Sequence, residues 1–150
     1  MNKNKNGFTL VELLAVMAII AMISIIAVPN VIKIMNGNKQ SKVLNDGLTL
    51  IALAKQEVAS SIDLRESLTE TGITRSLQRL DDKNDLTVDP DGILYDRTNS
   101  YVQISKVSGT IMYCVYLKSN NWSLNNSGNC VYEDMLLSDD GKDYVKIVES

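Results

Sequence analysis

The chain opens with a long apolar segment that few polar side chains interrupt. Between Phe8 and Val28 the only polar residues are Thr9, Glu12 and Ser24. A helix needs roughly 20 consecutive apolar residues to cross the hydrocarbon core of a bilayer. The segment therefore predicts one helix that is long enough and apolar enough to span a membrane.

Apolar positions continue beyond Pro29 with the spacing of an amphipathic helix. They recur, mostly in steps of three and four, at Val43, Leu44, Leu48, Ile51, Ala54, Val58 and Ile62. Proline inside a helix removes a hydrogen bond and clashes one turn back, so we expect a kink at Pro29. A helix over residues 8–60 would be about 80 Å long. Its first half needs lipid or other copies to bury it, and its second half carries one apolar stripe that can pack on a sheet.

The middle of the chain, about residues 62–100, is polar and rich in turn-forming residues. Residues 73–80 place three apolar side chains on one face and predict a short helix. Residues 89–92, Asp-Pro-Asp-Gly, are typical of a turn with proline second and glycine fourth. Six aspartates gather here, at Asp81, Asp82, Asp85, Asp89, Asp91 and Asp96. We interpret them as a solvated acidic loop, with a calcium site as the alternative because that ion takes oxygen ligands.

The last third of the chain has the pattern of antiparallel strands. Residues 101–107 and 111–117 are rich in tyrosine and β-branched residues, and residues 108–110, Ser-Gly-Thr, supply the turn between them. Between further turns rich in asparagine and glycine, strands are expected near residues 122–124, 130–132 and 144–148. We therefore predict an α+β fold in which a long, kinked N-terminal helix packs against a C-terminal antiparallel β-sheet.

Lys3 and Lys5 precede the apolar segment, and no acidic residue comes before Glu12. Because Lys and Arg accumulate on the cytoplasmic side of membrane helices, we expect the N-terminus inside and the rest of the chain outside. The 150 residues suit one domain, and the formal net charge is −3. An acidic chain does not favour nucleic-acid binding through a general basic surface.

Glu12 is a carboxylate placed one turn into the apolar segment. A charged side chain in a membrane helix costs about 2.5–3.5 kcal/mol on insertion scales and usually marks function. A cut after Gly7 would keep the helix and create an ammonium group on Phe8, four residues before Glu12. That ammonium, from the same chain or from another copy, would neutralise the carboxylate.

The stretch Gly7-Phe8-Thr9-Leu10-Val11-Glu12 resembles the processing site of type IV prepilins and of the related pseudopilins. The resemblance covers about residues 1–30. It joins a short basic leader, a glycine before an aromatic residue, a glutamate early in the mature chain and an uninterrupted apolar helix. Pro29 also lies where many members of this family have a proline.

The resemblance implies that a prepilin peptidase cuts after Gly7 and methylates the amino group of Phe8. It also implies that a pilus assembly platform and its ATPase stack the apolar helices in the centre of a filament. There Glu12 would meet the N-terminal amine of a neighbouring subunit and set the register. The precursor would lie in a bacterial cytoplasmic membrane with its head outside, and the pilus would be extracellular. The expected segments are a cleaved leader, a filament-core helix, an amphipathic helix and a globular α+β head, at residues 1–7, 8–29, 30–61 and 62–150.

Cys114 and Cys130 are the only cysteines. The family often has a disulfide in its C-terminal region, and the resemblance implies that these two residues pair. Such a bond would close a loop of about 15 residues and stabilise the fold by roughly 3 kcal/mol. Two free buried thiols are the alternative. A zinc site is not expected, because two cysteines in a chain without histidine cannot complete one.

We expect no enzymatic activity and no cofactor. The chain has no histidine, which is the commonest general base, and no glycine-rich phosphate loop. The sequence is therefore interpreted as the structural subunit of a type IV pilus that serves adhesion, motility or DNA uptake. The alternatives are a pseudopilin of a type II secretion or competence system and a monomeric membrane-anchored binding protein.

Overall fold

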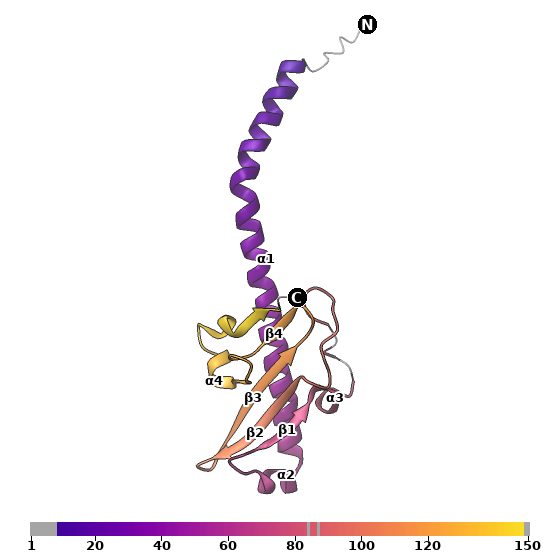
Figure 1. The fold of residues 1–150 in the computed structure, drawn as a ribbon, viewed down its shortest axis with the longest axis vertical. Helices are drawn as coiled ribbons and strands as arrows, with labels where there is room; N and C mark the ends of the chain where they lie inside the picture. Colours follow the sequence, from indigo (N-terminus) through magenta and orange to yellow (C-terminus); the bar gives the residue numbers. More distant parts are fainter. Residues whose placement is uncertain (1–8, 84, 87, 149–150) are drawn as a thin grey trace, which may run out of the picture. The chain divides into compact units, whose positions relative to one another are not determined.

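The computed structural model in Figure 1 describes residues 9–83, 85, 86 and 88–148. Its architecture is α+β, as the sequence predicts: the long helix α1 is followed by a C-terminal antiparallel sheet of six strands in the described part of the chain. The chain divides into two compact units, residues 1–37 and residues 38–150. The second unit contains the rear part of α1 together with these strands.

Helix α1 extends from Leu10 to Ser60. The helical conformation continues through Pro29, and the kink expected there stays a prediction. The residue at which the sequence predicts the helix to begin, Phe8, lies outside the described residues. The predicted segment boundaries near residues 29 and 61 likewise stay predictions.

Helix α1 ends at Ser60 because the next residue caps a new helix. Ser61 has an extended backbone, and its hydroxyl accepts a hydrogen bond from Leu64 N at 3.2 Å, which starts α2 (Ile62–Ser67). The break removes Ile62 from the apolar stripe of α1, and 69% of this residue is exposed. The prediction that Ile62 belongs to the buried stripe is therefore wrong.

The sheet is antiparallel and has the order β1-β2-β3-β4-β6, with β5 paired to β3. Its strands are β1 (Ile73–Ser76), β2 (Tyr101–Val107), β3 (Thr110–Lys118), β4 (Trp122–Leu124), β5 (Val131–Tyr132) and β6 (Val145–Ile147). The short helices are α3 (Leu77–Leu80), α4 (Glu133–Leu136) and the 3-10 helix η1 (Gly141–Tyr144). The strands that the sequence predicts in the last third of the chain are thus confirmed.

The β2–β3 hairpin forms around a two-residue loop. Val107 pairs with Thr110, and the loop residues Ser108 and Gly109 have φ angles of 50° and 85°. Positive φ at both loop positions is the geometry whose twist matches that of the flanking strands. Glycine adopts it without strain, so the Ser-Gly pair fixes both the turn and the register of the hairpin.

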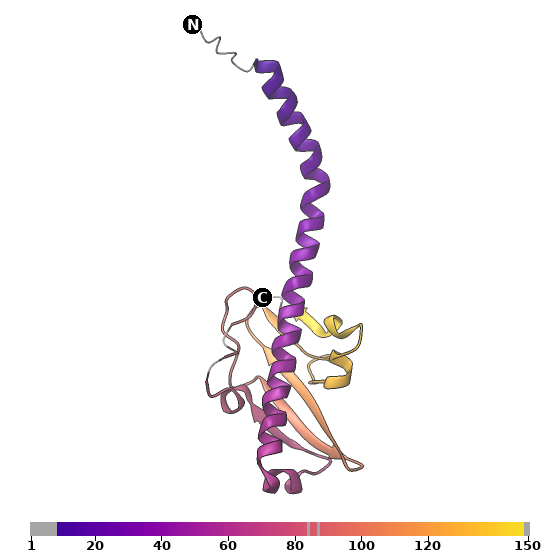
Figure 2. The ribbon, with the colours of Figure 1, turned by 180° about the vertical axis from the view of Figure 1, so that it is seen from behind.

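The core of the second unit lies between the rear part of α1 and the sheet. Figure 2 shows this part of the helix lying across the sheet. Leu50 of α1, Ile104 of β2 and Leu117 of β3 have no exposed surface. Truncating such a buried leucine to alanine costs about 2–5 kcal/mol. The fully buried stripe of α1 consists of Val43, Leu50, Ile51, Ala54 and Val58.

The predicted helix over residues 73–80 is half wrong, because residues 73–76 form the edge strand β1. Strand β1 pairs with β2, with Ile73 opposite Ile104. Helix α3 begins only at Leu77, whose backbone N–H donates to Ser100 O at 2.7 Å. The spacing of the apolar residues is compatible with a helix, but hydrogen bonds to a distant strand override that local preference.

Candidate functional site

The start of α1 is held by reciprocal hydrogen bonds between Thr9 and Glu12. Thr9 N and Thr9 Oγ1 donate to Glu12 Oε2 at 2.9 and 3.0 Å, and Glu12 N donates to Thr9 Oγ1 at 3.3 Å. Thr9 O accepts the first helical hydrogen bond, from Leu13 N at 3.2 Å. Thr9 is therefore the N-cap residue of a capping box. Sequence reasoning missed this role, although the Thr-x-x-Glu spacing carries the signal.

The capping box gives the two oxygens of Glu12 different surroundings. Oε2 accepts both hydrogen bonds from Thr9, whereas Oε1 accepts none from the described residues. Thr9 thus orients the carboxylate, and Oε1 is the oxygen that accepts no hydrogen bond from the described residues. Gly7 and Phe8, the predicted cleavage and methylation residues, lie outside the described residues, so their roles stay predictions.

The front part of α1 has an apolar surface on all sides. Among its large apolar side chains with described burial, those between Leu10 and Met35 range from 49% exposed at Val16 to 81% exposed at Leu10. The helix is long and apolar enough, by length and composition, to cross a membrane. Its internal hydroxyl is satisfied locally, because Ser24 Oγ donates to Ile20 O at 2.8 Å. Water is a poor environment for so much contiguous apolar surface, which requires lipid or other apolar partners.

Two of the clustered aspartates are buried, so the interpretation of a wholly solvated acidic loop is wrong. Asp81 is 2% exposed and Asp89 is 1% exposed. Asp81 accepts hydrogen bonds from Leu86 N at 3.0 Å and from the guanidinium of Arg97 at 3.2 Å. Asp89 Oδ2 accepts from the hydroxyl of Ser119 at 2.6 Å. Asp81 therefore joins two parts of the loop to each other, and Asp89 joins the loop to the residue that follows β3. Both buried side chains have hydrogen-bond partners, as buried polar groups in folded proteins usually do.

The predicted turn at residues 89–92 is confirmed. Gly92 N donates to Asp89 O at 3.1 Å, and Gly92 has a φ of 82°. Asp89 Oδ1 also accepts from the backbone N–H groups of Asp91 and Ile93, at 2.8 and 2.9 Å. The side chain of Asp89 therefore organises the turn. Within the described part of the chain, no group of three or more potential metal-ligating side chains could hold a metal ion.

Asp91 joins this loop to α1 and to β4. Its Oδ1 lies 2.6 Å from Lys39 Nζ, and its Oδ2 accepts from Trp122 Nε1, also at 2.6 Å. The hydrogen bonds from Lys39 and then from Trp122 lower the pKa of Asp91 below its ordinary value. A charged carboxylate thus attaches the loop to both α1 and β4.

Asp46 of α1 makes a second attachment to the same loop. Its Oδ2 accepts from Tyr95 Oη and from Lys42 Nζ, each at 2.7 Å. Lys42 Nζ also donates to Val88 O at 2.7 Å. Burial, and then the hydrogen bond with Asp46, raise the pKa of Tyr95 well above its ordinary value. Asp91 of the loop and Asp46 of α1 therefore hold the loop against the helix.

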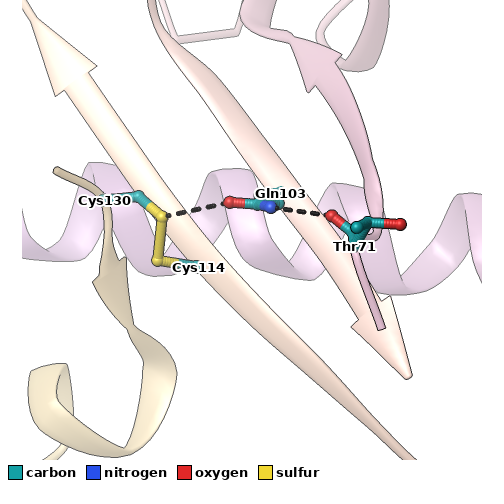
Figure 3. Close-up of a disulfide and its surroundings, with 4 residues drawn as sticks. All are labelled: Thr71, Gln103, Cys114 and Cys130. Atoms are coloured by element: carbon teal, nitrogen blue, oxygen red, sulfur yellow. Dashed lines mark hydrogen bonds between the residues drawn. A yellow bond between two sulfur atoms is a disulfide. The ribbon is translucent and has the colours of Figure 1, made fainter. Parts of the chain in front are cut away.

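Cys114 and Cys130 form a disulfide, which links β3 to the segment just before β5 (Figure 3). Cys114 is 2% exposed. Gln103 of β2 lies beside the bond, with its Oε1 3.7 Å from Cys130 Sγ, and its Nε2 donates to Thr71 O at 3.0 Å. Because an oxidised sulfur has no hydrogen to donate, the contact with Gln103 Oε1 is a packing contact. The free-thiol alternative does not describe this structure.

The comparisons with known proteins identify the N-terminal segment. Residues 2–28 match the family model described as the prokaryotic N-terminal methylation motif. This is the signal motif of type IV prepilins and pseudopilins, and it indicates a type IV pilin-like or pseudopilin protein. Proteins with this motif are structural rather than catalytic, and the motif implies processing by a prepilin peptidase and assembly into a pilus-like filament.

The motif and the apolar helix also fit a precursor that is anchored in a membrane. The match ends at residue 28 and does not include the head. No curated protein and no solved structure matches the chain significantly.

Proposed function

We propose that the chain is the structural subunit of a type IV pilus, which is made as a membrane-anchored prepilin and cleaved after Gly7. One observation carries the proposal: the methylation motif at residues 2–28 leads into a helix whose apolar side chains are exposed all round. In the membrane, lipid covers this helix; in a filament, the helices of other copies cover it. The proposed segments are a leader, a filament-core helix, an amphipathic helix and a head, at residues 1–7, 8–29, 30–61 and 62–150.

Glu12 is the residue that we expect to select and align the subunits. Because lipid is already apolar, moving an apolar helix from the membrane into a bundle of like helices gains little free energy from burial alone. A carboxylate and an ammonium attract strongly when both are removed from water. Glu12 Oε2 is held by Thr9, and Oε1 would accept from the N-methylated amine of Phe8 in a neighbouring subunit. Pairing at one position along the helix then fixes the register between subunits.

Substitution of Glu12 tests the proposed pairing. We expect both Glu12→Val and Glu12→Gln to leave the subunit in the membrane and to suppress filament assembly, because neither variant carries the charge. Surface-sheared filaments and membrane fractions are quantified in cells that make only the variant. Ser24→Ala is the matched control, since it removes a polar group from the same helix but leaves its charge unchanged, and filaments should form. Wild-type filament yield with Glu12→Val would refute the role of Glu12.

Substitution of Gly7 tests the proposed cleavage. A β-branched side chain next to the scissile bond should exclude the chain from the peptidase site, so we expect Gly7→Val to retain residues 1–7. Mass spectrometry of the purified subunit reads the N-terminus and any added methyl group. A mature N-terminus at Phe8 in this variant would show that Gly7 does not specify the cut.

A pseudopilin of a type II secretion or competence system is the second candidate, because the matched motif is shared by both groups. Electron microscopy of sheared surface material, labelled with antibody against the head, separates the two. Long surface filaments support the pilin, which would serve adhesion, motility or DNA uptake. Short filaments confined to the envelope support the pseudopilin. Unassembled protein that keeps residues 1–7 in the membrane would instead indicate a monomeric anchored binding protein.

A further inference from the structure

Half of strand β3 has a pairing partner on one side only. Strand β2 pairs with β3 from Thr110 to Tyr116. On the opposite side, β5 covers Cys114 and Val115, and β4 covers Leu117 and Lys118. Among the described residues, no strand pairs with residues 110–113 on that side. In Figures 1 and 2 the end of the β2–β3 hairpin extends past α4.

This free edge exists because β5 is very short. Tyr132 is both the last residue of β5 and the N-cap of α4, so the chain turns away from the sheet at Glu133. Alternate residues of an antiparallel strand direct both their N–H and C=O groups to the same side. Two of the four residues from Thr110 to Tyr113 therefore present backbone donors and acceptors to the free side.

The free edge lacks the protection of the other edge strands. Natural proteins block open edges with charged residues or proline. Strand β1 carries Arg75 and strand β6 carries Lys146. Residues 110–113, Thr-Ile-Met-Tyr, contain neither a charge nor a proline. Such a strand is a template for the addition of another strand.

A groove of about 210 Å³ borders this edge. The strand contributes Ile111, Met112 and Tyr113, and the segment after β5 contributes Tyr132, Glu133 and Asp134. Tyr132 is 42% exposed, so the groove combines apolar surface with backbone hydrogen-bonding groups. These are the two features by which a sheet edge recognises an extended peptide.

The two charged residues that line the groove, Glu133 and Asp134, are acidic, and two cations, Lys55 and Arg65, act on the Tyr113 side chain. Glu133 forms a salt bridge with Lys55, whose ammonium also lies 5.4 Å from the ring centroid of Tyr113. Asp134 is exposed and forms no salt bridge within the described part of the chain. Asp134 is thus the lining carboxylate without a salt bridge among the described residues, and its charge favours a cationic group on the occupant.

We propose that the free edge of β3 at residues 110–113 binds an extended segment of another protein, which adds to the sheet in line with β5. The segment is uncharged where it pairs with Thr110–Tyr113 and carries Lys or Arg at its N-terminal end. The polarity follows from the antiparallel sheet, since a strand antiparallel to β3 has its N-terminal end beside Tyr113 and Asp134. The backbone supplies the affinity, and Asp134 selects the direction. The inference concerns the head alone and does not depend on filament assembly.

A peptide titration of the isotope-labelled full chain in detergent micelles tests the proposal. The probe is acetyl-Lys-Val-Thr-Val-Thr-amide, and the controls replace Lys with Glu or move Lys to the C-terminal end. We expect amide shift changes over residues 110–113 and slower hydrogen exchange at Ile111 and Tyr113, whose N–H groups face the free side because Thr110 and Met112 pair with β2. Each control should bind roughly twofold to fivefold more weakly, as one exposed ion pair allows. Equal binding of the three peptides, or no change at these amides, would overturn the proposal.

Three variants locate the effect. Met112→Lys places a charge on the free edge and should abolish the slower exchange, whereas Thr74→Lys places the same charge on exposed β1 and should leave it intact. Asp134→Lys should reverse the preference, so that the peptide with Glu binds better than the peptide with Lys. Asp134→Lys changes an exposed side chain outside the core, and it keeps the test decisive if Met112→Lys does not fold. Unchanged peptide preference in Asp134→Lys would refute the selecting role of Asp134.

Discussion

Gly47 of α1 packs directly against Leu124 of β4. A Cβ atom at residue 47 would lie 2.3 Å from Leu124 Cδ2, and Leu124 has no exposed surface. Glycine inside a helix costs about 1 kcal/mol relative to alanine. In this chain the missing side chain allows the helix to approach the sheet closely, so the position serves packing.

We expect Gly47→Ala to lower the free energy of unfolding despite its better helix propensity. Overpacking a buried site costs about 1–3 kcal/mol, and alanine recovers about 1 kcal/mol of this, which leaves a net loss of up to about 2 kcal/mol. Urea denaturation of the full chain in micelles measures the difference. Gly37→Ala is the control, because a Cβ at residue 37 meets no atom within 4 Å. The packing account fails if both variants are stabilised.

Removal of the Thr9 hydroxyl should loosen the first turn of α1. Thr9→Val keeps the shape of the side chain but loses the hydrogen bonds to Glu12 Oε2 and from Glu12 N. We expect a loss of about 1 kcal/mol in local helix stability, seen as faster hydrogen exchange of the Glu12 amide in micelles. Thr9→Ser retains the hydroxyl and should behave as the wild type. Unchanged exchange in Thr9→Val would show that the cap contributes nothing.

The charge of Asp91 should make head stability depend on pH in the acid range. Its folded-state pKa is lowered, mainly by the hydrogen bond from Lys39. A carboxylate with a lowered pKa stabilises the fold above its unfolded pKa, and this contribution is lost as the pH falls through the folded value. We expect the wild type to exceed Asp91→Asn in stability at neutral pH, with the gap closing below about pH 3.9.

Denaturation curves at a series of pH values measure this gap. Asp82→Asn is the matched control, because Asp82 is an exposed carboxylate on the same loop. At neutral pH the wild type should not exceed Asp82→Asn in stability by a comparable amount. A gap that stays constant into the acid range would mean that Asp91 acts through its shape alone.

The disulfide should contribute substantially to the stability of the head. Its cysteines are 16 positions apart, and closure of a loop of this size is worth about 3 kcal/mol in the chain-entropy model. We expect the double variant Cys114→Ala, Cys130→Ala to lose about that much in urea denaturation. Reductant should destabilise the wild type similarly and leave the double variant unchanged. An equal effect of reductant on both proteins would indicate that it acts elsewhere.

Several elements could be predicted from local sequence because local rules decide them. The β2–β3 hairpin follows from two strand-forming runs around Ser108 and Gly109, and the turn at residues 89–92 follows from its proline and glycine. The capping box could also have been found, since Thr9 and Glu12 have the required spacing. Each of these features depends on residues that are close together in the chain.

Other features depend on contacts that the sequence pattern does not contain. The apolar spacing of residues 73–80 fits a helix, yet pairing with β2 makes half of this stretch a strand. Asp89 looks like a solvated loop residue, but it is buried, and Ser119, 30 positions away, donates a hydrogen bond to it. Ile62 continues the stripe in sequence, but Ser61 ends the helix before it.

The sequence by itself determined the membrane-competent helix, the processing motif and most of the strands, because these depend on local composition and spacing. Only the tertiary structure decided which aspartates are buried, why Gly47 is a glycine and which edge of the sheet is left free. Such features depend on how segments that are far apart in the sequence pack together in space. Hydrogen bonds and packing between those segments outweigh local preferences of about 1 kcal/mol or less per residue.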